Sequence, residues 1–159
     1  MKQLEKIPFG KVKFEGAELS YIAQSIANGH ISGDGDFSKR CESILCKETG
    51  GKKALLTTSC TDALEMSAIL CDISPGDEVI FPNFTFVSTV NAFVLRGAIP
   101  IFVDIDDKTL NISPRAIEQA ISKLTKAIVI VHYAGVSCDM DQIEKIAKKS
   151  KITIIEDNA

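Results

Sequence analysis

From residue 53 onward, short apolar runs alternate with segments of helical periodicity, and this alternation constrains the fold more than any other feature. The apolar runs are residues 54–56, 79–81, 101–103, 127–131 and 152–155. The segments between them that predict helices lie near residues 60–71, 86–96, 114–123 and 140–149. Nearly all-apolar strands joined by helices are typical of parallel sheets covered on both faces. The sequence therefore predicts an α/β fold, a mainly parallel sheet with helices on both faces.

The preceding residues have a helical pattern without runs of strand type. A first helix is predicted over residues 18–27, before Asn28-Gly29, a common helix ending. A second helix follows the Gly-rich loop 32–36 and ends near Thr49-Gly50. We therefore divide the chain into an N-terminal helical segment, residues 1–52, and a sheet-forming segment, residues 53–159.

Composition and charge exclude several classes of function. Eighteen Lys and Arg residues against 21 Asp and Glu residues give a net charge of −3, so nucleic acid and anionic membranes are poor candidate partners. Residues 1–7 contain no apolar signal core, and no stretch approaches the roughly 20 apolar residues of a membrane span. These features indicate a cytoplasmic protein. Five cysteines without a C-x-x-C pair or a Cys/His cluster predict neither a disulfide framework nor a metal site.

Polar side chains follow the apolar runs, where an open α/β sheet binds its ligands. The segments that contain them are residues 57–62, 82–86, 104, 132–135 and 156–159. Because the carboxyl ends of parallel strands meet at one edge, a single crevice can hold hydroxyl groups, an aromatic ring, a histidine and a carboxylate. This edge is therefore the predicted ligand site.

Each of these residues also has an ordinary structural interpretation. Ser59 and Asp62 match a capping box, which by itself indicates a capped helix, although the free N–H groups at residues 59–61 suit a phosphate. Phe86, by itself, is typical of a packed core side chain, and His132 is typical of a histidine whose hydrogen bonds are satisfied within the protein. Asp157 follows a buried apolar run, where a carboxylate needs a cation or hydrogen-bond donors. Its ordinary interpretation is a loop residue at the end of a strand or a helix cap. The functional hypothesis depends on the convergence of these residues.

Pyridoxal 5′-phosphate is the cofactor that needs a phosphate site, a flat aromatic ring and a buried carboxylate together. Its pyridine nitrogen needs an acid to remain protonated. A nicotinamide dinucleotide is the competing cofactor, but no strand is followed by G-x-G-x-x-G. The residues therefore favour pyridoxal phosphate.

The sequence resembles the N-terminal portion of the DegT/DnrJ/EryC1/StrS family of sugar-nucleotide aminotransferases, over essentially the whole chain. The matching segments are residues 33–35 with 37 and 40–41, 55–61, 75–80, 85–89 with 91–98, 131–135 and 156–157. The resemblance implies a fold-type I pyridoxal-phosphate transferase (aspartate aminotransferase-like), of which residues 53–159 form the first part of the large domain. It also implies that the rest of that domain and a small C-terminal domain lie outside this chain.

The resemblance further implies roles for individual residues. Ser59, Cys60 and Thr61 would bind the cofactor phosphate, Phe86 would stack on the ring, and Asp157 would pair with the pyridine nitrogen; His132 and Tyr133 would contact the substrate. The Schiff-base lysine of the family lies downstream of the Glu156-Asp157 motif, and no lysine of this chain matches it. We therefore expect no catalytic residue within this chain, a fragment that is inactive alone.

The reaction that the resemblance implies is transfer of an amino group from L-glutamate to a TDP-4-keto-6-deoxyhexose. The product would be TDP-4-amino-4,6-dideoxygalactose for surface polysaccharide synthesis, and the enzyme a homodimer. Ser-Cys-Thr at residues 59–61, in place of the commoner Ser-Gly-Thr, favours this branch. Two alternatives are a 3-keto sugar transaminase of the same family and a truncated, non-catalytic protein that binds pyridoxal phosphate or a partner.

Overall fold

The structure is a computed structural model that describes residue 8, residues 10–30 and residues 32–159. Residues 1–7, in which the sequence contains no apolar signal core, lie outside the described residues. The chain divides into two compact units, Met1–Leu56 and Thr57–Ala159. Among the described residues, no helix is both long and apolar enough to cross a membrane.

The first unit contains the two predicted helices, α1 (Glu18–Ala27) and α2 (Asp36–Thr49). Arg40 of α2 joins them, because its guanidinium carbon lies 5.3 Å from the centre of the Tyr21 ring and 4.9 Å from that of Phe37. The two rings are themselves 5.5 Å apart. A cation placed over aromatic faces in this way adds attraction to the apolar contact between the helices.

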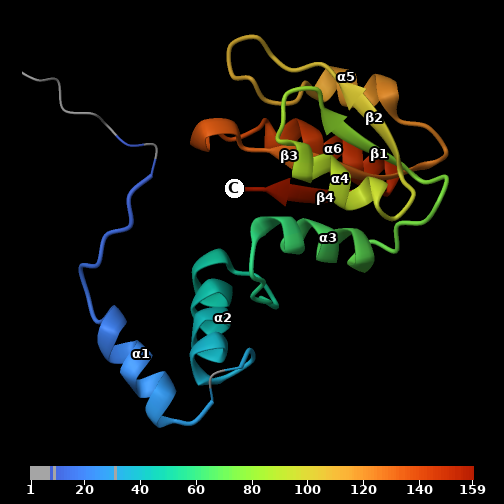
Figure 1. The fold of residues 1–159 in the computed structure, drawn as a ribbon. Coiled ribbons are helices and arrows are strands. Elements are labelled where there is room, and N and C mark those ends of the chain that lie inside the picture. The colour runs from blue at the N-terminus through green and yellow to red at the C-terminus, as the bar shows by residue number, and fades with distance from the viewer. Residues whose placement is uncertain (1–7, 9, 31) are drawn as a thin grey trace, which may run out of the picture. The chain divides into compact units, whose positions relative to one another are not determined.

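The second unit contains a four-stranded sheet in which every pairing is parallel (Figure 1). The strands are β1 (Glu78–Pro82), β2 (Ile99–Val103), β3 (Thr125–Val131) and β4 (Thr153–Asp157). Their order across the sheet is β2-β1-β3-β4. The predicted parallel α/β fold is thus confirmed.

Helices lie before β1 and between the strands, at the positions that the sequence predicts. They are α3 (Cys60–Leu70), α4 (Val87–Val94), α5 (Pro114–Ala120) and α6 (Met140–Ser150), with a 3-10 turn, η1 (Tyr133–Gly135), after β3. Ser113 caps α5, and Pro114 occupies its first position. This helix is shorter than the predicted 114–123, because the backbone becomes extended at Ile121.

Two apolar clusters hold the helices on opposite faces of the sheet. Alternate strand residues supply them, because successive side chains of a strand point to opposite faces. One cluster joins α3 and α4 to the sheet through Val79, Phe81, Ala127 and Val129. The other joins α5 and α6 to it through Ile80, Val103, Ile128 and Ile130.

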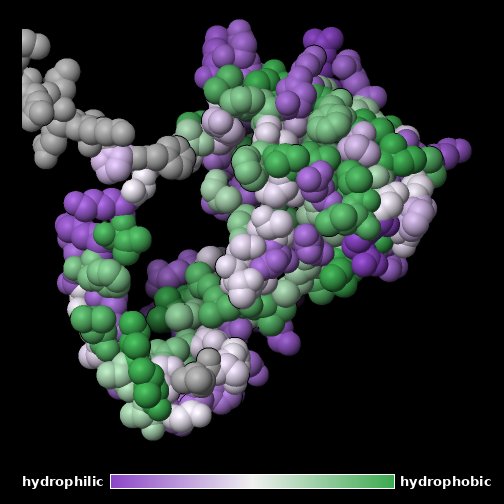
Figure 2. All heavy atoms as spheres, in the orientation of Figure 1, coloured by the Kyte–Doolittle hydropathy of each residue, from purple (hydrophilic) through white to green (hydrophobic). Residues whose placement is uncertain are grey.

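Some apolar side chains remain at the surface of the second unit. Leu95, Ile99 and Phe102 are exposed, and Figure 2 shows hydrophobic residues at the surface in the region of α4 and β2. Surface apolar residues are common in folded proteins. They contribute little to the two clusters that hold the sheet.

The strand predicted over residues 54–56 is wrong. These residues have no strand pairing in the described part of the chain. A strand depends on hydrogen bonds to a neighbouring strand, which an apolar run does not guarantee. Three apolar residues are also too few for periodicity to separate a strand from other packed chain.

Candidate functional site

The site lies at the carboxyl ends of the strands, where the chain changes direction across the sheet. From β1 the chain first passes to β2 on one side and then returns to β3 on the other, so the topological switch point lies between β1 and β3. Open α/β sheets bind ligands at this point. The segments that follow β1, β3 and β4 here contain Phe86, His132, Tyr133 and the last residues of the chain.

The amino end of α3 has the geometry of an anion site. Ser59 caps the helix, and its Oγ accepts a hydrogen bond from the N–H of Asp62 at 3.1 Å. No described residue accepts a hydrogen bond from the N–H of Cys60 or Thr61. Free N–H groups at a helix amino end, aligned with the helix dipole, attract a phosphate. The predicted phosphate-binding residues are therefore consecutive at one helix end.

Asp62 places an acidic side chain in the first turn of α3. The hydroxyl of Thr58 donates to its carboxylate. Hydrogen bonds from Thr58 and then Ser59 hold the pKa of Asp62 below its ordinary value. The carboxylate is thus ionised and tied to the loop before the helix.

Replacing Ser59 by alanine should lower the free energy of unfolding by about 1 kcal/mol, because the amino end of α3 loses its capping acceptor. Urea denaturation would measure the change. Ser67→Ala in the same helix is the control, since the Ser67 hydroxyl only donates back to the Ala63 carbonyl, at 2.8 Å. Equal losses in the two variants would contradict a capping role for Ser59.

Asp157, at the end of β4, is a buried carboxylate held by neutral donors. Its side chain is largely covered, the residue being only 6% exposed. Oδ2 accepts from the Thr89 hydroxyl at 2.7 Å, and Oδ1 accepts from the Ala159 N–H at 3.2 Å and the Cys60 thiol at 3.7 Å. None of the ion pairs among the described residues involves Asp157. A buried carboxylate of this kind strongly favours a cation beside it.

Cys60 links the helix end to this carboxylate. Partial burial, and then the negative charge and hydrogen bond of Asp157, raise the pKa of its thiol above the ordinary value. The predicted phosphate residues and the predicted ring-nitrogen partner are therefore in contact within one site.

The Cys60 thiol should react with iodoacetamide faster in Asp157→Asn than in the natural sequence. The thiolate is the reactive form, and removing the neighbouring negative charge lowers the thiol pKa and raises the thiolate fraction near pH 8. Mass spectrometry of the peptide that contains Cys60 would follow the rate, with the exposed Cys41 as internal reference. An unchanged rate at Cys60 would contradict the contact with Asp157.

Phe86 lies at the amino end of α4 with its ring in solvent. The residue is 73% exposed and forms no ring pair with another described aromatic residue. The ordinary interpretation of a packed core side chain therefore does not describe it. An exposed ring beside the switch point is available to a flat ligand.

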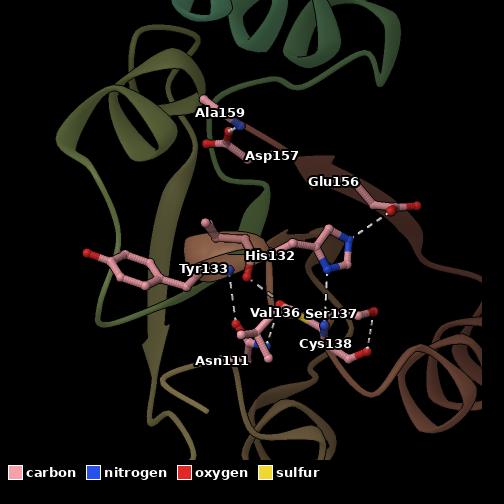
Figure 3. Close-up of polar contacts among 10 residues, drawn as sticks. Asn111, His132, Tyr133, Val136, Ser137, Cys138, Glu156, Asp157 and Ala159 are labelled. Carbon is pink, nitrogen blue, oxygen red and sulfur yellow. Dashed lines mark hydrogen bonds and ion pairs between the residues drawn. The ribbon is translucent and has the colours of Figure 1, made fainter. Parts of the chain in front are cut away.

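His132 is fixed at both ring nitrogens (Figure 3). Nδ1 accepts from the backbone N–H of Cys138 at 3.0 Å, and Nε2 lies 2.9 Å from Oε2 of Glu156. Because Nδ1 accepts, a neutral ring carries its proton on Nε2 and donates it to Glu156. The predicted substrate contact through His132 stays a prediction, and neither ring nitrogen is without a protein partner.

Tyr133 is placed by the turn after β3. Its N–H donates to Oδ1 of Asn111 at 3.1 Å, and Asn111 Nδ2 donates to the Val136 carbonyl at 2.9 Å. Its ring lies 4.4 Å from that of Phe84, which follows β1. The two rings therefore meet across the switch point. An open cavity of about 390 Å³ lies nearby, lined by His132, Ala134, Gly135, Ser137, Asn158 and Ala159.

Two residues that organise the site are not predicted from the sequence. Thr89 is fully buried and binds Asp157; its spacing of three and four residues from Ala92 and Phe93 indicates the buried face of α4 and was the available signal. Asn111 brackets the turn after β3 and is 4% exposed. No local pattern distinguishes Asn111, because the partners of its side chain lie more than twenty residues away.

Comparison with known proteins gives a family match over nearly the whole chain. The model of the DegT/DnrJ/EryC1/StrS aminotransferase family matches residues 13–159. Among similar solved structures is NtdA from Bacillus subtilis with bound cofactor PMP, which is 33% identical with a TM-score of 0.89, over 98% of this chain and 37% of that one.

Two further solved structures are similar to this chain over nearly its whole length. The PMP form of the putative sugar aminotransferase Spr1654 from Streptococcus pneumoniae is 29% identical, with a TM-score of 0.88 over 98% of this chain and 43% of that one. The E. coli GDP-4-keto-6-deoxy-D-mannose-3-dehydratase with bound hydrated PLP is 26% identical, with a TM-score of 0.88 over 99% of this chain and 42% of that one. This chain thus spans about two fifths of the length of these proteins.

Proposed function

The chain belongs to the DegT/DnrJ/EryC1/StrS aminotransferase family, and we propose that it binds pyridoxal 5′-phosphate as part of a sugar-nucleotide aminotransferase. The observation that carries the proposal is the buried Asp157 carboxylate, which has three neutral donors and no cationic partner among the described residues. Because the chain spans about two fifths of the similar structures, the whole activity belongs to the proposal.

The residues present fit the parts of this cofactor. The free N–H groups of Cys60 and Thr61, with the Ser59 cap, suit its phosphate. The exposed ring of Phe86 suits a stacked pyridine, and the Asp157 carboxylate suits a protonated ring nitrogen. When bound, the cofactor supplies a ring that withdraws electrons from the reacting carbon. Asp157 would keep the proton on that nitrogen, and the N–H groups of Cys60 and Thr61 would hold the phosphate.

The proposed reaction moves an amino group from L-glutamate to the C4 keto carbon of a TDP-4-keto-6-deoxyhexose. Its product would be TDP-4-amino-4,6-dideoxygalactose, the reaction of a transaminase of surface-polysaccharide synthesis, carried out by a cytoplasmic homodimer. The support is the resemblance of residues 59–61 and 132–135 to this branch of the family. His132 and Tyr133 lie at the end of β3, at the proposed sugar-binding edge.

Product analysis tests this function. The whole protein is incubated with pyridoxal phosphate, L-glutamate and either TDP-4-keto-6-deoxyglucose or its 3-keto isomer, and the sugar is examined by NMR. An amino group at C4 of the 4-keto sugar is the expected result, whereas amination of the 3-keto isomer alone, at C3, would assign the protein to the 3-keto branch. Cofactor binding without amination of either sugar would favour the non-catalytic alternative. Absence of both binding and turnover would overturn the proposal.

A further inference from the structure

We propose that Thr89 is a positioning residue that fixes the Asp157 oxygen that accepts the ring N–H of the cofactor. The inference rests on the proposed function and deepens it. It concerns a hydroxyl group of α4 that lies 68 residues before Asp157 in the sequence and donates to Oδ2 at 2.7 Å.

The position of Thr89 is set by packing. The residue is 0% exposed, and Ala92 and Phe93, on the same face of α4, belong to the cluster that holds this helix on the sheet. The Phe93 ring meets that of Phe81 edge-on at 5.5 Å. Closely packed side chains of this kind keep one rotamer. The Thr89 hydroxyl is therefore a rigid donor.

The donors around Asp157 are unequally divided between its two oxygens. Oδ1 accepts from the Ala159 N–H and the Cys60 thiol, whereas Oδ2 accepts from Thr89 alone. A carboxylate has about four lone-pair sites, two on each oxygen. The site left for a further donor is thus on Oδ2, the oxygen that Thr89 holds.

Thr89 also makes the strongest of the three hydrogen bonds. An O–H donor at 2.7 Å from an ionised oxygen is charge-assisted, whereas a thiol at 3.7 Å is a weak donor. The bond restricts rotation of the carboxylate and leaves the second lone pair of Oδ2 in one direction. Without the hydroxyl, Oδ2 has no donor among the described residues, and the carboxylate loses this orientation.

The test compares two ligands that differ only at the ring nitrogen. Pyridoxamine 5′-phosphate forms no imine with surface lysines, and its 1-deaza analogue has C–H in place of the nitrogen. Calorimetry gives both dissociation constants for the natural protein and for Thr89→Val, Thr89→Ala, Thr89→Ser and Ser88→Ala. Ser88 is the matched control, a neighbouring hydroxyl of α4 without a hydrogen bond to Asp157 among the described residues.

We expect the natural protein to bind pyridoxamine phosphate about 10- to 100-fold more tightly than the analogue. Thr89→Val should reduce this preference by about tenfold, while Thr89→Ser and Ser88→Ala keep it. Thr89→Val and Thr89→Ala both remove the hydroxyl but differ in shape. The variant that retains the native circular dichroism spectrum is the one used to judge whether loss of the hydroxyl reduces the preference.

The outcomes separate the inference from the proposed function. No preference in the natural protein would refute the pairing of Asp157 with the ring nitrogen, and the inference would fall with it. A natural preference that survives loss of the hydroxyl would overturn the role of Thr89 and leave the proposed function standing. Equal weakening of both ligands would show that Thr89 is merely structural, and would also overturn it.

Discussion

Replacement of Asp157 by asparagine is expected to weaken the binding of pyridoxamine 5′-phosphate by about 10- to 100-fold. The amide keeps the size of the side chain but carries no negative charge, so a protonated ring nitrogen loses its ionic partner. Because Asp157 is buried, water does not replace the lost interaction. The 1-deaza analogue, which has no ring nitrogen, should bind the variant and the natural protein about equally.

Asp104→Asn is the matched control for this measurement. Asp104 follows β2 at the same edge of the sheet, and its carboxylate accepts from Asn83 Nδ2 at 2.9 Å. It is an aspartate like Asp157 but is exposed, so its replacement should leave binding nearly unchanged. Equal affinities of Asp157→Asn and the natural protein, with a native circular dichroism spectrum, would remove Asp157 from the site.

The sequence contained enough information to predict the sheet and to select candidate site residues. Val79 and its neighbours form an apolar run bounded by turn residues, and the structure confirms a strand there. Asp157 was a candidate because a carboxylate directly after a buried run needs a partner. Residues 54–56 had the same apolar character but no strand pairing in the described structure. Local composition does not specify the neighbouring strand.

The hydrogen-bond partners of His132 were not predictable from the sequence. Its two partners, Cys138 and Glu156, come from the loop before α6 and from β4. The register that pairs Val131 with Asp157, and a turn in which Ala134 has a φ of 52°, bring them together. Pairing register and turn geometry arise from tertiary structure. A histidine after a strand therefore indicates only a position near the ligand edge.

The role of Thr89 was only partly predictable from the sequence. Its place on the buried face of α4 was readable from the spacing of Ala92 and Phe93. Its acceptor was not, because α4 and β4 are separated by β2, α5, β3 and α6 in the chain. A buried hydroxyl on an apolar helix face indicates that an acceptor exists, since unpaired buried donors are costly. The structure identifies that acceptor as Asp157.

Replacing Phe81 by alanine should lower the free energy of unfolding by about 3–5 kcal/mol. Phe81 is fully buried in β1, directly before the segment that carries the predicted ring platform. Its ring packs edge-on against Phe93 of α4 at 5.5 Å. The variant would lose this contact and leave a cavity between the sheet and the helix that carries Thr89. Chemical denaturation monitored by circular dichroism would measure the loss.

Phe102→Ala is the control, because Phe102 also lies beside Phe81, with 6.3 Å between ring centres, yet is 55% exposed. Removing an exposed ring transfers little apolar surface to water and leaves no closed cavity, so we expect a much smaller loss of stability. Similar losses in both variants would mean that burial between β1 and α4 does not hold the second unit together. Since α4 carries Thr89, Phe81→Ala should also reduce the preference for pyridoxamine phosphate over its deaza analogue, whereas Phe102→Ala should not.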